Sequence, residues 1–212
     1  MRFIKSVNWG PTFAGPPSST FRTAIPNATA SIKHAQKLNA LRHCSIVLQY
    51  HHSEVITVRK QKVMALISDL YEGQPLAQWN ARYRNKRLRP YLAFHVLYNL
   101  ICGLEAIHAV GSYHADVHTE NILIQPMGVR FNLKLIDFYD WGRPAAFKRR
   151  QDIGDAIRVF YNCLGGAKHY AKLPANAKYI CAGLRDSLIL KRFPTMTALR
   201  QHLESFEWSS MI

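Results

Sequence analysis

Apolar side chains recur every three to four positions along two long stretches of this chain, which is the period of an α-helix. The first stretch runs from Pro90 to Ala109, and the second begins at Asp152 and is closed by Gly165-Gly166. Proline suits the first turn of a helix, glycine suits the position just past its end, and aspartate can cap a first turn. The pattern therefore predicts two long helices.

Two short apolar runs between these helices are strand-like, because they are too short for the helical period. They cover residues 122–124 and 134–136. The strands and turns place the polar residues beside them at defined positions, and these polar residues carry the chemistry.

The segment with the most chemical content reads His114-Ala115-Asp116-Val117-His118-Thr119-Glu120-Asn121-Ile122-Leu123-Ile124, followed by Lys134-Leu135-Ile136-Asp137-Phe138. It places an aspartate, an asparagine five residues on and a second aspartate sixteen further along, each beside an apolar run. Phosphoryl transfer needs one carboxylate to accept or orient the attacking hydroxyl, and an amide and a carboxylate to hold Mg²⁺ on the phosphates. We therefore expect Asp116 to be catalytic, and Asn121 and Asp137 to bind the metal.

The pattern H-x-D-x-x-x-x-N-I-L-I followed by L-I-D-F resembles the catalytic and metal-binding loops of the protein kinase-like superfamily, and the resemblance extends over roughly residues 31–206. It implies an α+β fold with a reduced N-lobe sheet and a mainly helical C-lobe. In the N-lobe it implies one helix near residues 31–41 and a last strand that begins near residue 65 and leads into a small polar turn, and in the C-lobe a final helix after Pro194. The implied divisions are an N-terminal arm or partial first strands over 1–30, a reduced N-lobe over 31–72, and a C-lobe over 73–212.

The same resemblance implies ATP and Mg²⁺ as cofactors. The adenine would bind backbone groups of a hinge near Asp69 and Tyr71, and His118 and Asn121 would join Asp116 in catalysis. Asp152 would tie down the backbone of the catalytic loop.

The N-terminal region departs from the family. The glutamate that should pair with the ATP-anchoring lysine falls near His34, and no acidic residue precedes Glu54. Lys5 is the remaining candidate for that lysine, and a solvated basic residue is the alternative interpretation. Residues 8–27 are rich in proline and predict a flexible arm or linker.

The segment after Asp137 is also reduced. Residues 138–151 contain no serine or threonine, and Ala115 replaces the arginine that would pair with a phosphorylated loop. We therefore expect activity that does not depend on phosphorylation of this segment. Arg192 would also lack the glutamate with which the family usually pairs it.

Three functions are consistent with these residues. The first is a divergent minimal protein kinase that transfers the ATP γ-phosphate to a serine or threonine hydroxyl of a protein. The second is a weak or inactive pseudokinase that acts as a binding module. The third is a small-molecule phosphotransferase similar to aminoglycoside and choline kinases, because those enzymes often carry a histidine at the position of His118 and an acidic residue near Asp140.

A metal-binding alternative rests on the spacing of two histidines. His114 and His118 stand four positions apart, as zinc-binding histidines do on a helix, but Ala115 occupies the position of the glutamate that the zincin motif requires. The following residues also predict a loop that leads into a strand rather than a helix.

Composition and charge bear on partners and location. The chain has 212 residues, of which 48% are hydrophobic, which suits one core, and its net charge is +15. Clusters such as residues 82–89 and 148–150 favour an acidic protein substrate, nucleic acid or an anionic lipid surface, and a solvated face is the alternative.

The sequence shows no apolar run of membrane-spanning length, and scattered cysteines predict reduced thiols. We expect an intracellular, cytoplasmic protein; a mitochondrial presequence is the alternative, and the oligomeric state stays open.

Overall fold

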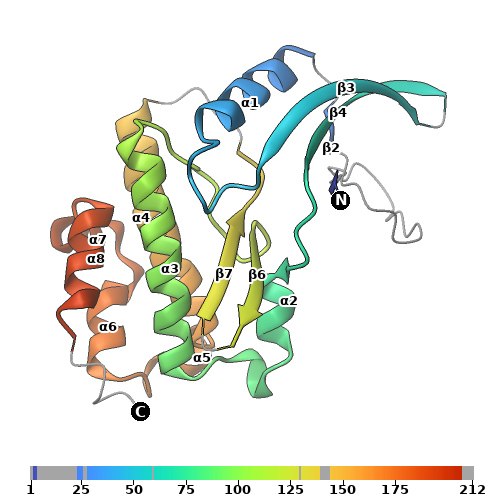
Figure 1. Ribbon diagram of the computed structural model, residues 1–212. Coiled ribbons are helices and arrows are strands. Elements are labelled where there is room, and N and C mark those ends of the chain that lie inside the picture. Colours follow the sequence, from blue (N-terminus) through green and yellow to red (C-terminus); the bar gives the residue numbers. More distant parts are fainter. Residues whose placement is uncertain are drawn as a thin grey trace. The chain divides into compact units, whose positions relative to one another are not determined.

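The computed structural model describes residues 2–3, 23–25, 28–58, 60–128, 130–138 and 144–206. Contacts along the chain divide it into two units, Met1–Glu72 and Gly73–Ile212. The first unit combines a small antiparallel sheet with one helix, and the second combines a smaller sheet with most of the helices (Figure 1).

The central strand of the first unit is β4 (Gln61–Asp69). Its partner β3 (Tyr50–Val58) runs antiparallel to it over nearly its whole length, with an irregularity between Tyr50 and His52. Two short strands, β1 (Arg2–Phe3) and β2 (Thr23–Ile25), also pair antiparallel with β4. Because β3 already occupies one edge of β4, β1 and β2 share the other edge.

The strand β2 corrects the interpretation of residues 8–27 as a linker throughout. It pairs Thr23 with Leu66 and Ile25 with Met64. Three residues are too few to show a strand period in the sequence, so only the neighbouring strand reveals this one.

The helix α1 (Ala28–Ala40) confirms the helix predicted near residues 31–41 and begins three residues earlier. It packs against β2, β3 and β4. The core of this unit contains aliphatic side chains from the segment after α1 and from β4: Leu41, Ile46, Val47, Ala65, Leu66 and Ile67.

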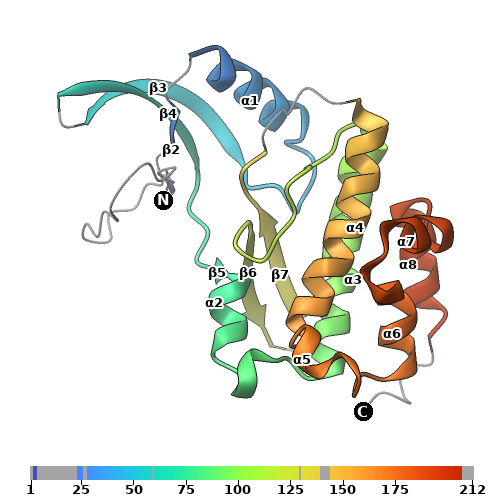
Figure 2. The ribbon, with the colours of Figure 1, turned by 180° about the vertical axis from the view of Figure 1, so that it is seen from behind.

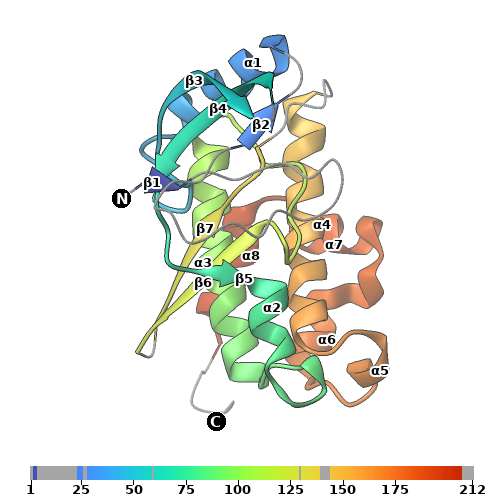
Figure 3. The same cartoon turned by 90° about the vertical axis from the view of Figure 1, so that its right-hand side faces the viewer.

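The sheet of the second unit has the order β5-β6-β7. Its strands β5 (Gln74–Pro75), β6 (Ile122–Met127) and β7 (Arg130–Leu135) are antiparallel. The helix α2 (Leu76–Ala81) follows β5 directly and contacts β5 and β6 (Figure 3). A 3₁₀ turn, η1 (Arg84–Lys86), then leads to the long helices.

The helix α3 (Pro90–Ala109) has the bounds predicted from the apolar pattern, which confirms that prediction. It packs against α4 (Ala145–Cys163), α8 (Met196–Glu204) and β7 (Figures 1 and 2). The ring centroids of Phe94 and Phe160 lie 4.8 Å apart between α3 and α4. Four shorter elements complete the unit: α5 (Ala167–Tyr170), α6 (Ala175–Cys181), η2 (Ala182–Leu184) and α7 (Asp186–Arg192).

The start of α4 differs from the prediction. The helix begins at Ala145, so Asp152 lies in its interior and does not cap its first turn. The extra turns have no apolar stripe in the sequence, which is why the pattern missed them. The end was predicted correctly, because Gly165 and Gly166 adopt left-handed φ angles of 92° and 63° just past the helix.

By length and composition, α3 is also the one helix of the described residues that qualifies as a membrane span. Nine of its residues are buried against the rest of the unit, as in the core helix of a folded domain. The four cysteines are free thiols, and Cys44, Cys163 and Cys181 are buried.

Candidate functional site

The loop between α3 and β6, residues 111–121, is anchored by the buried carboxylate of Asp152. Its Oδ1 accepts the backbone N–H of Ala115 at 2.6 Å, and its Oδ2 accepts the backbone N–H of His114 at 2.9 Å. Asp152 is 0% exposed. A buried carboxylate that accepts two amides fixes the backbone between them. These contacts confirm that Asp152 ties down this loop.

Two further side chains support the same loop, and the sequence analysis missed both. His108 at the end of α3 places Nε2 2.9 Å from Asp152 Oδ2. Gln151 donates from Nε2 to the carbonyl oxygen of Ala115 at 2.9 Å. The peptide groups on both sides of Ala115 are therefore held, which stabilises its left-handed φ of 70°. A polar residue within an apolar helical pattern was the only signal for His108.

His114 joins the two halves of the motif. Its Nε2 lies 2.9 Å from the carbonyl oxygen of Ile136, and its Nδ1 accepts the backbone N–H of Asp116 at 3.2 Å. A carbonyl can only accept, so Nε2 carries the proton. Because both ring nitrogens are engaged in these bonds, His114 is not a zinc ligand, and this contradicts the zinc alternative.

Asp116 and Asn121 face one another across the turn of the loop. The Asn121 side-chain nitrogen donates to the Asp116 carbonyl oxygen at 3.0 Å and to its Oδ2 at 3.3 Å. His118 places Nε2 3.6 Å from the same Oδ2. Asn121 is buried, whereas the side chains of Asp116 and His118 are 43% and 48% exposed. A buried amide thus orients a carboxylate that solvent and substrate can reach.

The β6–β7 hairpin brings Asp137 to the same end as Asn121. The pair Ile122↔Leu135 is in register, and the backbone N–H of Ile136 donates to the Asn121 carbonyl oxygen at 3.1 Å. Asp137 follows directly with a left-handed φ of 68°. Phe138 is 0% exposed, and its ring centroid lies 4.4 Å from that of His114.

The donor set at this end of the hairpin fits Mg²⁺. Mg²⁺ prefers oxygen ligands and often uses only one or two protein groups together with phosphate oxygens and water. Asp137 offers a carboxylate. Asn121 directs its amide nitrogen to Asp116, which leaves the amide oxygen as its metal-binding atom. No group of three or more histidine, cysteine or acidic side chains forms a metal site within the described residues.

The nucleotide-binding candidates belong to the first unit. The backbone N–H of Asp69 donates to the Gln49 carbonyl oxygen at 2.9 Å, and its side chain lies 2.6 Å from His51 Nε2. Tyr71 is buried. Lys5 and Asp140 lie outside the described residues. The structure thus brings Asp116, His118, Asn121 and Asp137 together, and it places Asp69 and Tyr71 at the end of the other unit.

The structure gives Arg192 a different partner from the glutamate that the sequence lacks. Its guanidinium lies 4.2 Å from the ring centroid of Tyr179 and donates to the carbonyl oxygen of Tyr179. A cation–π contact with a hydrogen bond can hold an arginine in place of an ion pair.

Comparisons with known proteins agree with this geometry. The profile of the protein kinase domain family matches residues 25–151. The serine/threonine-protein kinase PkaB of Streptomyces coelicolor is 36% identical over 86 residues, which are 39% of this chain and 20% of that protein. The sporulation protein kinase mde3 of Schizosaccharomyces pombe is 41% identical over 51 residues, 22% of this chain and 9% of that protein. The alignments thus span a fifth or less of these relatives.

A solved structure gives the fold. The Drosophila melanogaster PAN3 pseudokinase superposes with a TM-score of 0.65 at 14% identity, over 84% of this chain and 53% of that one. This likeness confirms the α+β kinase-like fold that the motif order implied.

Proposed function

The chain belongs to the protein kinase domain family, and we propose that it transfers the γ-phosphate of ATP to a serine or threonine hydroxyl of a protein. One observation carries the proposal: the side chain of Asp116 is oriented by buried Asn121 within a loop that buried Asp152 holds. Catalysis of phosphoryl transfer consists mainly of positioning and charge stabilisation, so a positioned carboxylate is the central requirement.

Each residue of the site has a separate task in this proposal. Asp116 orients the attacking hydroxyl and accepts its proton, for which its exposure is suitable. Asn121 and Asp137 hold Mg²⁺, which would neutralise charge on the ATP phosphates. His118, beside Asp116, would stabilise negative charge on the transferred group when it is protonated. The backbone near Asp69 and Tyr71 would receive the adenine, and Lys5 stays a candidate for the anchoring lysine.

The substrate and the location of the protein follow from charge and composition. The net charge of +15 favours an acidic protein segment over a basic one. Free, mostly buried thiols suit a reducing compartment, so we propose an intracellular and cytoplasmic setting.

A transfer assay tests the proposal. The full chain is incubated with ATP, Mg²⁺ and three peptide sets that are acidic, neutral or basic and carry serine, threonine or tyrosine. We expect phosphate on serine or threonine of the acidic set, and loss of transfer in Asp116→Asn. Glu54→Gln, which removes an exposed carboxylate of β3, is the matched control and should retain activity. Equal activity of wild type and Asp116→Asn would contradict the proposal.

A pseudokinase that acts as a binding module is the second candidate, and α1 supplies the observation that favours it. This helix carries no acidic residue, and buried His34 occupies the region where the family has its glutamate. The usual lysine–glutamate pair therefore cannot form from α1. A chain that binds Mg-ATP in a thermal-shift assay but transfers no phosphate to any peptide or water would support this candidate.

A small-molecule phosphotransferase is the third candidate, favoured by the 3.6 Å contact between His118 and Asp116. Transfer to amino alcohols or aminoglycosides, with none to the peptide sets, would select it.

A further inference from the structure

A cavity of about 760 Å³ opens in the second unit where the end of α3, the first turns of α4 and the start of α8 meet. We call it the Arg149 pocket and define it by six of its lining residues: His108, Arg149, Arg150, Ile153, Met196 and Arg200. Its described lining does not include Asp116, Asn121 or Asp137. Its volume lies in the range of small-molecule sites.

The lining of the Arg149 pocket contains three arginines and one carboxylate, Glu105, and two of the arginines form no ion pair among the described residues. Arg149 donates from Nη1 to the carbonyl oxygen of Gly111 at 3.1 Å, which is a neutral partner. Arg150 is exposed and has no hydrogen bond or ion pair among the described residues. The third arginine, Arg200, differs because Glu105 and Glu204 bind it at 2.7 and 2.8 Å and raise its pKa. Two guanidinium groups are therefore available to an anion.

Part of the lining is apolar, and we call this part the floor of the pocket. It consists of Ile153 and Met196, which are 2% and 1% exposed, and of Ala109, Ala146 and Pro194. The first turn of α8 adds its positive dipole end, because the Thr195 hydroxyl caps only the amide of Ala198, at 3.1 Å. A ligand that fits must combine an anionic group with an apolar part.

We propose that the Arg149 pocket binds an organic phosphate, a phosphate monoester carried on an apolar stem. Guanidinium groups match phosphate oxygens in charge and geometry, and the buried floor of Ile153 and Met196 would receive the stem. The ligand is either a phosphorylated side chain of a protein or a small phosphorylated molecule. The proposal concerns a second site and does not require that the protein transfer phosphate.

The walls of the Arg149 pocket also contact the loop that carries Asp116. His108 lines the pocket and lies 2.9 Å from Asp152 Oδ2, the atom that accepts the amide of His114. Arg149 bonds the carbonyl of Gly111, where the loop begins. A phosphate that draws Arg149 away from Gly111 would therefore change the support of the loop, so occupancy of the pocket should alter loop protection.

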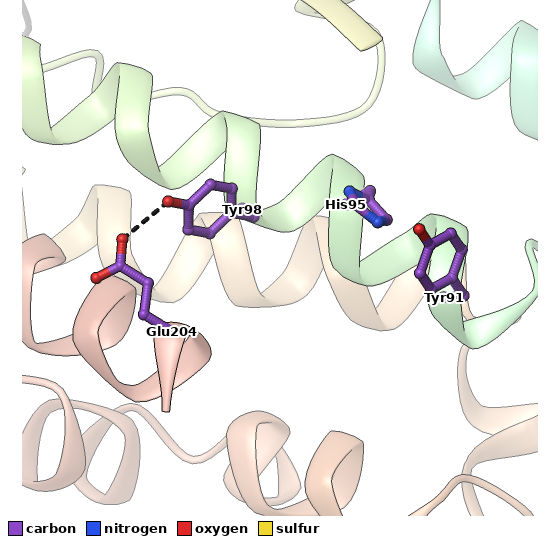
Figure 4. A pocket seen from close by; sticks show the side chains of 4 residues that line it. All are labelled: Tyr91, His95, Tyr98 and Glu204. Carbon is purple, nitrogen blue, oxygen red and sulfur yellow. Dashed lines mark hydrogen bonds between the residues drawn. The ribbon is translucent and has the colours of Figure 1, made fainter. Parts of the chain in front are cut away.

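A cavity at the other end of α3 shows why the arginines matter. It measures about 350 Å³ and is lined by Tyr91, His95, Tyr98 and Glu204 (Figure 4). Its carboxylate accepts the Tyr98 hydroxyl at 2.8 Å, and this bond raises the pKa of Tyr98 to about 12. The charged group there is anionic and already bonded, so this cavity has nothing to attract a phosphate.

The test is a calorimetric titration of the full chain with three compounds in separate experiments: phenyl phosphate, inorganic phosphate and phenol. We expect phenyl phosphate to bind more tightly than either of its parts. The double variant Arg149→Ala/Arg150→Ala should weaken binding by about tenfold or more, because two charged hydrogen bonds are lost. The matched control Arg82→Ala/Arg84→Ala removes the same charge from exposed residues after α2 and should leave the affinity unchanged.

Three further measurements locate the binding site and identify the class of ligand. Asp137→Ala should bind phenyl phosphate as wild type does, which separates the pocket from the candidate catalytic site. Arg150→Ala alone should weaken binding and should fold normally, because this exposed side chain has no hydrogen bond or ion pair among the described residues. A phosphotyrosine peptide that binds more tightly than phenyl phosphate would identify a protein ligand, and equal affinities would identify a small one.

The proposal is overturned if phenyl phosphate shows no saturable binding, or if both double variants weaken it equally. The link to the loop is tested separately by hydrogen exchange with and without phenyl phosphate. Unchanged protection of the His114 and Ala115 amides at saturation would overturn that link and leave the binding site intact.

Discussion

The two units of the chain carry the residues expected for phosphoryl transfer to different degrees. In the second unit, Asp116 is oriented by Asn121, and the hairpin pairing joins Asn121 to Ile136, the residue before Asp137. Buried Asp152 holds the loop through two backbone amides. In the first unit, α1 has no acidic residue, and β1 and β2 are two and three residues long.

The difference has a physical reason. The second unit holds its loop through buried contacts within one core, and removal of Asp152 would leave two buried backbone amides unsatisfied. The nucleotide contacts expected of the first unit are mostly to backbone groups, so its side chains can change at less cost. The contrast predicts that mutations in the second unit have large and separable effects.

The largest effect should come from the proposed metal ligand. Asp137→Ala should reduce phosphate transfer by about a hundredfold to a thousandfold or more, because it removes the charged group proposed to hold Mg²⁺. It should also abolish the part of nucleotide stabilisation that depends on Mg²⁺. Asp116→Ala should lose transfer equally but keep nucleotide binding, because its task concerns the acceptor hydroxyl. Thermal shifts with and without Mg-ATP distinguish the two, and identical curves for all three proteins would refute nucleotide binding.

Loss of the loop anchor should be the next largest effect. Asp152→Ala leaves two buried amides and His108 without their acceptor, so it should lower the free energy of unfolding by about 3 kcal/mol. Denaturant melts measure this quantity. Asp152→Asn keeps one acceptor oxygen, so its free energy of unfolding should lie between those of wild type and Asp152→Ala. If Asp152→Ala has the same free energy of unfolding as wild type, the second unit does not depend on this contact.

Asp155, one turn after Asp152 on α4, should give a pH-dependent effect. Burial raises its pKa from 3.8 to about 6 despite the neighbouring Arg158. The folded state therefore binds this proton more tightly than the unfolded state, so its contribution to stability is full at low pH and is lost as pH rises through about 6. The free energy of unfolding of Asp155→Asn, relative to that of wild type, should therefore increase by on the order of 2 to 3 kcal/mol between pH 3 and pH 7. A pH-independent difference in denaturant melts would contradict this.

The smallest effect is expected from phosphatase treatment. Residues 138–151 contain no serine or threonine, and Ala115 stands where the family has its phosphate-binding arginine. A phosphatase-treated sample should therefore transfer phosphate at the same rate as an untreated one. A large loss would mean that the short segment is regulated after all, with Tyr139 as the residue to examine by mass spectrometry.

Some of the molecule was predictable because the signals are local. The helix α3 has the bounds that its apolar period predicted, and the apolar runs beside Asn121 and Asp137 indicated the strands β6 and β7. The fold class followed from the order of these motifs. Each of these features depends on residues that are close together in the sequence, so the sequence pattern records them.

Other features depend on residues that are far apart in the sequence and were settled by packing. The sequence analysis took Asp152 as a helix cap, but α4 begins at Ala145 and turns this carboxylate toward His114. His108 meets Asp152 across 44 residues, and Gln151 meets Ala115 across 36. Packing also decides which arginine of the Arg149 pocket forms an ion pair, because only Arg200 lies within bonding distance of Glu105.

The amino-acid sequence by itself determined which polar groups this protein has at the candidate site, because side-chain chemistry and short-range spacing are written directly in it. The tertiary structure alone decided which of these groups are held, by what, and where charge is left uncompensated. The physical reason is that a buried hydrogen bond or an unpaired guanidinium is a property of neighbours, and neighbours are chosen by the packing of α3, α4 and α8.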